Sequence, residues 1–456
     1  MKRKVFLQGG VILCLSVLFV LSCLTLSYGD EANAGVAGAL YDESATAESL
    51  GLEPLVLPDD FYPVYMWDHD WARTYATIEE SLTGMAECEL TTSCFVRAED
   101  VPLCERLGLK CMVEIGVDCH GFKEKPAEEI ESLFRPVIES TRESEAVIGY
   151  YLIDEPGADE FAGLAKCVAA VKKLAPGKFA YINLFPGYAS KLGVDAVSQL
   201  QTHTYTEYLE RFVQEVRPQC LSYDNYLVEY SEDMANAELG AGYYKDLLEV
   251  RRVARKYKIP FWNIVSSMSI TDSSTPPNVS RLAFQAYTSL AAGAEGLGWF
   301  LYYPVMGSYT PVGKDKERTI IWEYLRVVNK QVRVLGTVLN RYETTGVFFS
   351  EATVGAELPV MPGQVVTELN AEYSHVVDPG KRPTCMLGEF RAKEGQGLAF
   401  MIVNLDFSHS VKVDPKLAAE GRSLQVVSPI TGSVSGERPS SGWWILPGHG
   451  MLFIVE

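Results

Sequence analysis

A regular alternation of strand-like and helix-like segments occupies the middle of the chain. Short apolar runs are each followed by a longer amphipathic segment, and the unit repeats about every 33 residues. A repeat of this length suits a strand, a crossover helix and the two loops that join them. Parallel strands connected by helices are buried on both faces, so the pattern predicts an α/β domain. The expected strands are residues 62–67, 91–96, 110–115, 147–153, 179–184, 220–223, 260–266 and 296–303.

Eight such units in about 240 residues suit a closed (β/α)8 TIM barrel, a fold that typically takes ~250 residues. The alternative is an open doubly wound sheet, which usually carries a Gly-rich phosphate loop after its first strand. The sequence has no such loop there, so we predict the barrel, closed by a long helix over residues 317–339. The other helices are expected at residues 71–86, 99–107, 127–142, 160–174, 206–216, 243–257 and 280–292.

The pattern changes after residue 340, where short alternating runs are separated by Gly, Pro and Asp. Runs of this kind predict an antiparallel β-sandwich of about 100 residues. We therefore expect a barrel domain at residues 58–340, a β-sandwich at 341–456, and an Ala- and Gly-rich linker at 30–57. The expected sandwich strands are residues 346–350, 384–392, 397–405, 410–413, 423–427, 442–445 and 451–455.

The first 29 residues have the composition of a secretory signal peptide. Three basic residues precede an apolar stretch at 11–26, and small residues follow, with a cleavage site expected after Gly29. An alternative interpretation is a bacterial lipobox at residues 20–23, which would make Cys23 a lipidated N-terminus anchored in a membrane. Either way we expect an exported protein that is periplasmic, secreted or lipid-anchored at the cell surface.

The formal net charge of −19 argues against nucleic acid as a partner, because nucleic-acid binding needs a basic patch. Eight cysteines lie outside the signal segment, and an exported chain can form disulfides. One or two bridges among Cys88, Cys94, Cys104 and Cys119 are expected, with buried free thiols as the alternative. No protein partner is inferred.

The fourth expected strand carries two carboxylates at its C-terminal end. Seven mostly apolar residues run into Asp154 and Glu155, and Pro156 ends the run. In barrels of this kind, ligands and catalytic groups lie at the C-terminal ends of the strands. A purely structural alternative is that Asp154 caps the next turn while Glu155 is solvated.

The other strand ends are acidic and aromatic. They carry no cluster of Lys or Arg, which argues against phosphorylated substrates. Carboxylates, amides and aromatic rings together suit neutral sugars, whose CH faces pack on rings and whose hydroxyls bond to polar groups. His69 has no paired histidine spacing, so no metal site and no cofactor are expected. The side chains expected to bind substrate are Asp68, Asp154, Asn183, Tyr223, Trp299 and Tyr303.

These motifs resemble the retaining glycoside hydrolases of the large (β/α)8 clan, and family 42 β-galactosidase-like proteins in particular. The clan ends its fourth strand in Asn-Glu-Pro, and this chain has Asp154-Glu155-Pro156 there. Residues 284–287 and 293–300 resemble the segment before the eighth strand in family 42. The resemblance implies that Glu155 is the general acid/base. It also implies a nucleophilic Glu at the end of strand 7, where this chain has Ser266-Ser267-Met268 instead.

The second catalytic carboxyl must therefore come from elsewhere. Retention needs two carboxyls ~5 Å apart and inversion needs ~6.5–9.5 Å. Asp224 ends the sixth strand, two strands from Glu155, and is the expected base or nucleophile; Asp68, Glu114 and Asp272 are weaker candidates. We predict an exported glycoside hydrolase that acts on a poly- or oligosaccharide. The alternative is a catalytically inactive barrel that binds glycans.

Overall fold

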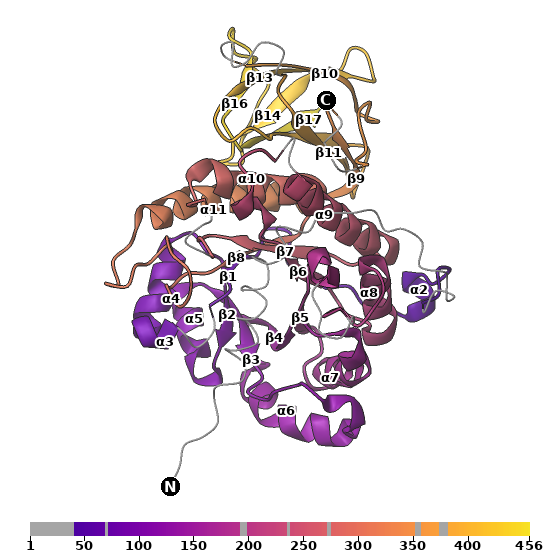
Figure 1. The fold of residues 1–456 in the computed structure, drawn as a ribbon, viewed down its shortest axis with the longest axis vertical. Helices are drawn as coiled ribbons and strands as arrows, with labels where there is room; N and C mark the ends of the chain where they lie inside the picture. The colour runs from indigo at the N-terminus through magenta and orange to yellow at the C-terminus, as the bar shows by residue number, and fades with distance from the viewer. Residues whose placement is uncertain are drawn as a thin grey trace.

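The structure is a computed structural model that describes residues 41–68, 72–191, 198–234, 238–270, 275–351, 357–373 and 382–456. A barrel forms one part of the molecule and a β-sandwich packs on one side of it (Figure 1). The predicted signal segment with Cys23 lies outside the described residues, as do His69 and Asp272. Among the helices that the structure describes, none combines the length and the apolar character needed to span a membrane.

Eight parallel strands close into a barrel in sequence order, which confirms the predicted fold class. The first and last strands pair directly, with Tyr65 opposite Gly298 and Met66 opposite Trp299. The strands are β1 (Val64–Met66), β2 (Thr92–Val96), β3 (Lys110–Glu114), β4 (Val147–Asp154), β5 (Phe179–Leu184), β6 (Leu221–Asp224), β7 (Phe261–Ser266) and β8 (Gly296–Phe300).

Helices surround the barrel, as the amphipathic segments predict (Figure 1). The single helix expected at 71–86 is instead two helices, because Thr77 interrupts it with a capping box. The Thr77 hydroxyl accepts from the Glu80 amide at 3.2 Å, and the Glu80 carboxylate accepts from the Thr77 amide at 2.9 Å. The helices are α2 (Ala47–Leu50), α3 (Ala72–Tyr75), α4 (Ile78–Glu87), α5 (Val101–Leu107), α6 (Ala127–Thr141), α7 (Phe161–Leu174), α8 (Tyr205–Arg211), α9 (Glu238–Tyr257), α10 (Val279–Ala292) and α11 (Ile320–Leu339).

Aromatic side chains fill the inside of the barrel. Tyr65, Trp67, Tyr181 and Trp262 belong to one buried cluster in which neighbouring ring centroids lie 5.5 to 6.1 Å apart. Residues that alternate with them along the strands pack outward against the helices. The interior is therefore a packed core, and the carboxylates of the barrel strands lie at the ends of β3, β4 and β6.

The C-terminal region is an antiparallel β-sandwich, as predicted. A three-stranded sheet (β10-β13-β16) faces a six-stranded sheet (β15-β14-β17-β12-β11-β9), with an apolar cluster between them. The sequence pattern missed β10, because a bulge near Val366 breaks its alternation and only one of its residues is fully buried. The strands are β9 (Tyr342–Phe349), β10 (Val366–Tyr373), β11 (Cys385–Ala392), β12 (Leu398–Asn404), β13 (Val411–Leu417), β14 (Leu424–Val427), β15 (Val434–Ser435), β16 (Trp443–Ile445) and β17 (Gly450–Val455).

The six-stranded sheet packs directly on α10, so the two parts share a core. Gly388 of β11 lies so close to the helix that a Cβ there would come within 2.0 Å of the Ala291 carbonyl oxygen. Gly450 of β17 similarly lies against the ring of Tyr287. Glycine at these positions lets the sheet approach the helix backbone closely.

The disulfides expected among Cys88, Cys94, Cys104 and Cys119 are absent from the structure, in which all eight described cysteines are free and buried. Cys88 lies against α11, where its Sγ is 3.7 Å from the Trp322 carbonyl oxygen. Cys94 instead belongs to the cluster inside the barrel. Cys88 and Cys94 therefore serve as small apolar side chains in separate parts of the core, which was the alternative expectation.

Candidate active site

Two carboxylates meet at the carboxyl ends of the two barrel strands that flank β5. Asp154 ends β4 and Asp224 ends β6, and Asn183 of β5 lies between them. The Asn183 Nδ2 donates to Asp154 Oδ1 at 3.1 Å and to Asp224 Oδ1 at 2.9 Å. One shared donor limits the separation of these two oxygens to about 6 Å, close to the range of paired catalytic carboxyls. Asp154 and Asp224 are called the carboxyl pair below.

The electrostatics of the carboxyl pair favour a retained proton. Burial raises the pKa of Asp154 to about 7, against the opposing effect of the Asn183 hydrogen bond. Burial and then the charge of Asp154 raise the pKa of Asp224 well above its usual range. Two carboxyls this close, with Asp224 buried and Asp154 half-buried, cannot both ionise without a large cost, which favours one shared proton near neutral pH.

Glu155 follows directly after β4 and adopts a left-handed backbone conformation, with φ of 45°. Its amide donates to the Asn183 carbonyl oxygen at 2.9 Å. The chain has therefore turned at this residue, and the strand rule that neighbouring side chains point to opposite sides no longer separates Glu155 from Asp154. The charges of Glu155 and Asp224 both raise the pKa of Tyr188 and of Tyr226, after the larger effect of burial. The structure thus brings the two predicted catalytic residues around the same hydroxyl groups.

Half-buried tyrosines surround these acids. Tyr151 belongs to β4, Tyr188 follows β5, and Tyr226 follows β6, where its ring lies 5.2 Å from that of Phe300. None of the three was expected as a site residue. Tyr226 could have been found, because it comes two residues after the strand end that carries Asp224. Tyr188 had no comparable signal, because it lies in a short 3-10 helix, Gly187–Lys191, beyond the end of β5.

The end of β7 receives a carboxylate from a neighbouring loop. Glu229 lies in a short 3-10 helix, Leu227–Tyr230, after β6, and it is 5% exposed. One of its oxygens accepts a hydrogen bond from the Ser266 hydroxyl, and the other accepts from the Ile270 amide at 2.8 Å. The residue therefore ties the loops after β6 and β7 together at the position where the clan has its nucleophile. No sequence signal marked it, because it is distant from any strand end.

Asp68 is buried just beyond β1, and neither of its carboxylate oxygens has a hydrogen-bond partner among the residues that the structure describes. Burial raises its pKa well above the usual range. The charge of Asp68 raises the pKa of Cys94 and of Tyr303, in each case after the larger effect of burial. Tyr303 stacks on Tyr75, with ring centroids 5.5 Å apart. Among the described residues, no contact joins Asp68 or Tyr303 to the carboxyl pair.

Tyr223 and Trp299 point away from the barrel interior. Ser222 and Asp224 face inward on β6, so the alternation of the strand turns Tyr223 toward the helices, and its hydroxyl has no partner. Trp299 lies in the outer cluster, where its Nε1 donates to Asn329 Oδ1 of α11 at 2.7 Å. Both were expected to bind substrate, and applying the strand alternation to β6 and β8 would have placed them outside the mouth.

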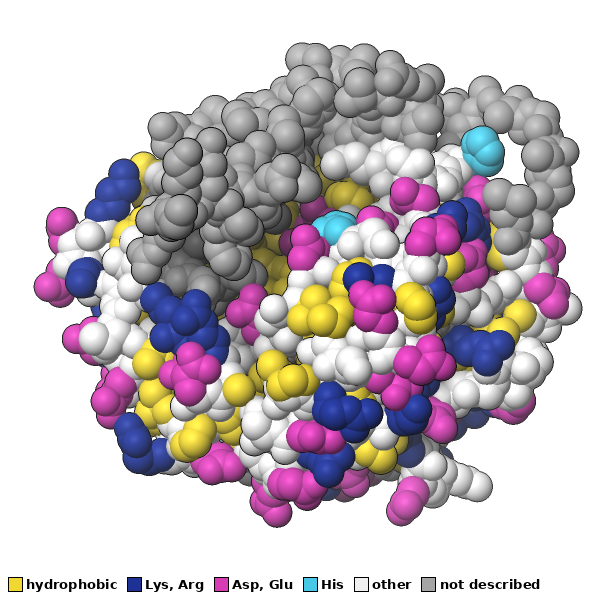
Figure 2. Space-filling view, turned by 90° about the horizontal axis from the view of Figure 1, so that it is seen from below, with side chains coloured by type: hydrophobic (Ala, Val, Ile, Leu, Met, Phe, Trp, Pro, Cys, Tyr) yellow, Lys and Arg dark blue, Asp and Glu magenta, His cyan; other side chains and the backbone are white. Residues whose placement is uncertain are grey.

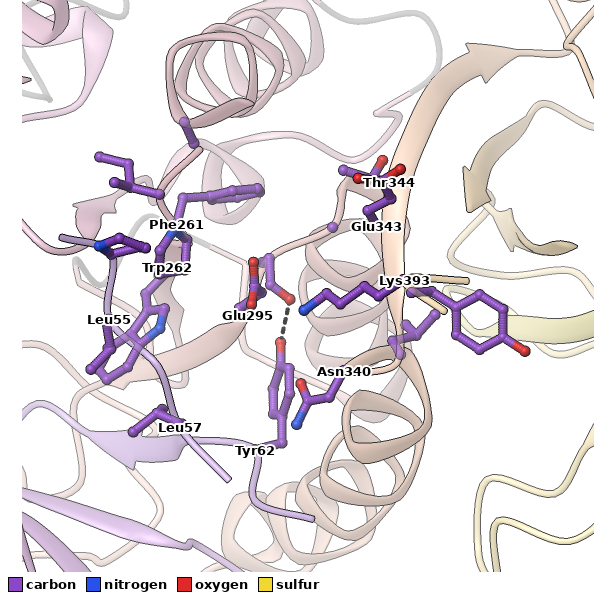
Figure 3. Close-up of a pocket in the computed structure, with 18 of the residues that line it drawn as sticks. Leu55, Leu57, Tyr62, Phe261, Trp262, Glu295, Asn340, Glu343, Thr344 and Lys393 are labelled. Atoms are coloured by element: carbon purple, nitrogen blue, oxygen red, sulfur yellow. Dashed lines mark hydrogen bonds between the residues drawn. The ribbon is translucent and has the colours of Figure 1, made fainter. Parts of the chain in front are cut away.

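A cavity of about 400 Å³ lies at the opposite, amino-terminal end of the barrel. It lies among Tyr62, Trp262, Glu295 and the start of the sandwich, and Figure 3 shows Lys393 reaching toward Glu295 across it. Desolvation by the surrounding protein raises the pKa of Glu295, although the side chain is exposed to the cavity. Barrel residues at this end usually serve stability. The chemistry is therefore assigned to the carboxyl ends of the strands, where the acids converge.

Solved glycoside hydrolases are similar to this chain in fold. A family 42 β-galactosidase from G. stearothermophilus has a TM-score of 0.56 and 8% identity, over 88% of this chain and 99% of that chain. A family 5 glycoside hydrolase from Bacteroides vulgatus has a TM-score of 0.50 and 9% identity, over 91% of this chain and 95% of that chain. A β-galactosidase from Marinomonas ef1 matches with a TM-score of 0.44 and 9% identity, over 61% of this chain and 60% of that chain.

No protein-family model matches the chain, and no curated protein matches its sequence. At identities this low, the likeness to solved structures concerns the fold alone. It confirms the resemblance in fold to family 42 proteins. The activity has to be argued from the residues at the mouth of the barrel.

Proposed function

We propose that the chain is an exported glycoside hydrolase, β-galactosidase-like in its fold, that cleaves glycosidic bonds in a poly- or oligosaccharide. The observation that carries the proposal is the meeting of Glu155 and the carboxyl pair at the carboxyl ends of β4 and β6. Cleavage of a glycosidic bond needs one carboxyl that donates a proton and one that is ionised. This group contains both.

In the proposed reaction, Glu155 is the general acid and gives its proton to the glycosidic oxygen as the bond to the anomeric carbon breaks. Glu155 is half-buried, so its side chain can reach a substrate. The carboxyl pair shares one proton and one negative charge, and Asp224, the expected group, acts as base or nucleophile in the state in which Asp154 carries the proton. As a base it takes a proton from the attacking water; as a nucleophile it forms an ester that water then cleaves.

The surroundings of these acids suit a neutral sugar. Tyr151, Tyr188 and Tyr226 offer ring faces and hydroxyls to a pyranose, and half-buried Asp154 can accept a sugar hydroxyl. A carbohydrate is also consistent with the charges on the face opposite the sandwich, where acidic and basic side chains are interspersed among the described residues in view (Figure 2). Nucleic acid would call for a continuous basic patch.

A second candidate function is glycan binding without hydrolysis. The end of β7 favours it, because Ser266 stands there and the nearby Glu229 carboxylate is occupied by the Ser266 hydroxyl and the Ile270 amide. A barrel that has lost its nucleophile would keep the tyrosines and acids that hold a sugar. The two candidates share a ligand and differ in whether the glycosidic bond breaks.

The test is a panel of aryl glycosides and polysaccharides, assayed for released sugar and for binding. The wild-type protein should hydrolyse at least one member, and Glu155→Gln and Asp224→Asn should each lose about a thousandfold in kcat. Tyr223→Phe is the matched control, because that side chain faces the helices, and it should keep full activity. Binding without release of sugar by the wild type would establish the second candidate instead. Unchanged hydrolysis by Glu155→Gln would refute the assignment of the acid.

Export is a separate part of the proposal and rests on residues 1–29. Two forms of the exported chain are expected, one cleaved after Gly29 and one lipidated at Cys23. The mass of the mature chain, isolated from cells that express the full sequence, distinguishes them. Cleavage after Gly29 gives an unmodified chain, whereas a lipobox gives a chain that begins at a lipidated Cys23. An intact N-terminus in the cytoplasmic fraction would overturn both.

A further inference from the structure

A continuous chain of buried polar side chains runs through the aromatic core of the barrel and ends at the carboxyl pair. The Tyr65 and Tyr181 hydroxyls lie 2.8 Å apart, and the Tyr181 hydroxyl lies 2.9 Å from Ser222 Oγ. Ser222 Oγ donates to Asn183 Oδ1 at 3.0 Å. Each of these four side chains is at most 2% exposed. We call Tyr65, Tyr181 and Ser222 the hydroxyl relay.

The direction of every hydrogen bond in the hydroxyl relay follows from the proton count. The oxygen of the Asn183 amide can only accept, so Ser222 donates its single hydroxyl proton to that oxygen. Ser222 Oγ must then accept a hydrogen bond from the Tyr181 hydroxyl. Because the Tyr181 hydroxyl donates there, it must accept from the Tyr65 hydroxyl. The chain therefore donates in one direction, from Tyr65 toward Asn183.

This direction matches one orientation of the Asn183 amide, which the carboxyl pair selects because an ionised carboxylate accepts hydrogen bonds and cannot donate them. The amide oxygen faces Ser222, so the NH2 group faces the carboxyl pair and supplies one proton to each carboxylate oxygen. The reverse orientation would place the carbonyl oxygen against both carboxyls, which is tolerable only if both are protonated. A rigid amide with two occupied N–H bonds also sets the distance between the two carboxylates.

We propose that Ser222, Tyr181 and Tyr65 are positioning residues, which fix the orientation of the Asn183 amide and through it the spacing and protonation of Asp154 and Asp224. Their role in catalysis rests on the proposed glycosidase function, but their effect on the carboxyl pair does not. None of the three touches the reacting atoms. They act at the pair through Asn183 alone.

A simpler role for these side chains is packing of the barrel core, and a pH profile distinguishes the two. A packing defect lowers stability and activity at every pH. Loss of the fixed amide removes donation to the ionised carboxylates, so the acidic limb of the rate profile must move to higher pH. The other titratable groups that interact electrostatically with the pair stay in place in every variant: Tyr151, Glu155, His120, Tyr188, Tyr205, Tyr208, Tyr223 and Tyr226.

The experiment compares Ser222→Ala, Tyr181→Phe and Tyr65→Phe with the wild type. Each step toward Tyr65 leaves more of the hydroxyl relay intact, so the shifts should decrease in that order. Ser222→Ala should move the acidic limb of kcat upward by about one pH unit, which is about a tenfold loss of rate below the limb. Ser93→Ala is the matched control, because Ser93 is a buried serine of the neighbouring strand β2 that makes no contact with the relay, and it should leave the limb unchanged.

A second measurement keeps the inference separate from the proposed function. Infrared titration follows the carboxyl stretch of the pair, assigned by subtracting the spectrum of Asp224→Asn, and needs no substrate. If the carboxyl pair of Ser222→Ala titrates at a higher pH than that of the wild type, and the wild type hydrolyses no glycoside, the positioning role is supported and the glycosidase function is refuted. Hydrolysis by the wild type, with neither the limb nor the infrared titration moved in Ser222→Ala, would overturn the positioning role and leave the glycosidase standing.

Discussion

Replacement of Asp154 by Asn is expected to stabilise the protein near neutral pH while removing its activity. Burial raises the pKa of Asp154 to about 7 in the folded protein, whereas its usual value is 3.8. A carboxyl with a raised pKa contributes stability that is fully present below the unfolded pKa and is lost as the pH rises through the folded pKa. The wild type should therefore lose this contribution between about pH 4 and pH 7. An Asn at this position is neutral and has no such loss.

The size of the effect follows from the shift. About three pKa units at ~1.4 kcal/mol each give an upper bound of about 4 kcal/mol. Asp154 is only half-buried, and solvent screening reduces this bound to about 2 kcal/mol. Asp154→Asn also removes the charge that raises the pKa of Asp224, which acts in the same direction.

The assay is the free energy of unfolding from urea denaturation, measured for wild type and variant at about pH 4 and about pH 8. Asp154→Asn should be more stable than the wild type by about 2 kcal/mol at the higher pH and close to it at the lower pH. Asp315→Asn, at an exposed position, should change stability equally at both. A variant that is less stable than the wild type at the higher pH, or equally displaced at both, would refute the electrostatic argument.

Three further predictions concern residues outside the carboxyl pair. Trp299→Phe removes the donor to Asn329 and should cost about 1–3 kcal/mol of stability without changing the affinity for a glycan, as denaturation and titration calorimetry can show. Gly388→Ala places a methyl group against the Ala291 carbonyl and should lower the unfolding free energy by about 2 kcal/mol or more; an unaltered melting temperature would contradict the close packing of sheet and helix. Glu389→Gln turns an amide group toward three backbone N–H donors of the sandwich, each at 2.8 Å, and should cost about 2–3 kcal/mol in denaturation.

The barrel could be predicted from sequence because its signal is repeated eight times. Each unit pairs a doubly buried strand with an amphipathic helix, and the errors are local. Thr77 and Glu80 divide one predicted helix through a capping box that the hydrophobic period does not contain. The strand at Val366 was missed because a bulge interrupts its alternation.

The site was less predictable because it depends on which way each side chain points. Strand ends identified Asp154, Glu155, Asn183 and Asp224, all of which the structure brings together. Alternation along β6 excludes Tyr223, and this could have been read from the position of Asp224 one residue later.

Other features of the site depend on contacts between segments far apart in the sequence. Glu229 reaches the end of β7 from a loop after β6. The left-handed backbone conformation at Glu155 occurs at a residue other than glycine, so the sequence does not indicate it. Neither feature has a local sequence pattern, so only the three-dimensional structure reveals them.

The dependence of hydrolysis on the leaving group tests the central claim most directly. A general acid is needed only when the departing oxygen is a poor leaving group, so Glu155→Gln should still release dinitrophenol from an activated aryl glycoside of the accepted sugar at close to the wild-type rate of glycosidic cleavage. The same variant should lose about a thousandfold on the natural glycan. Equal losses on both substrates would contradict the assignment of Glu155 as the acid at the mouth of the barrel.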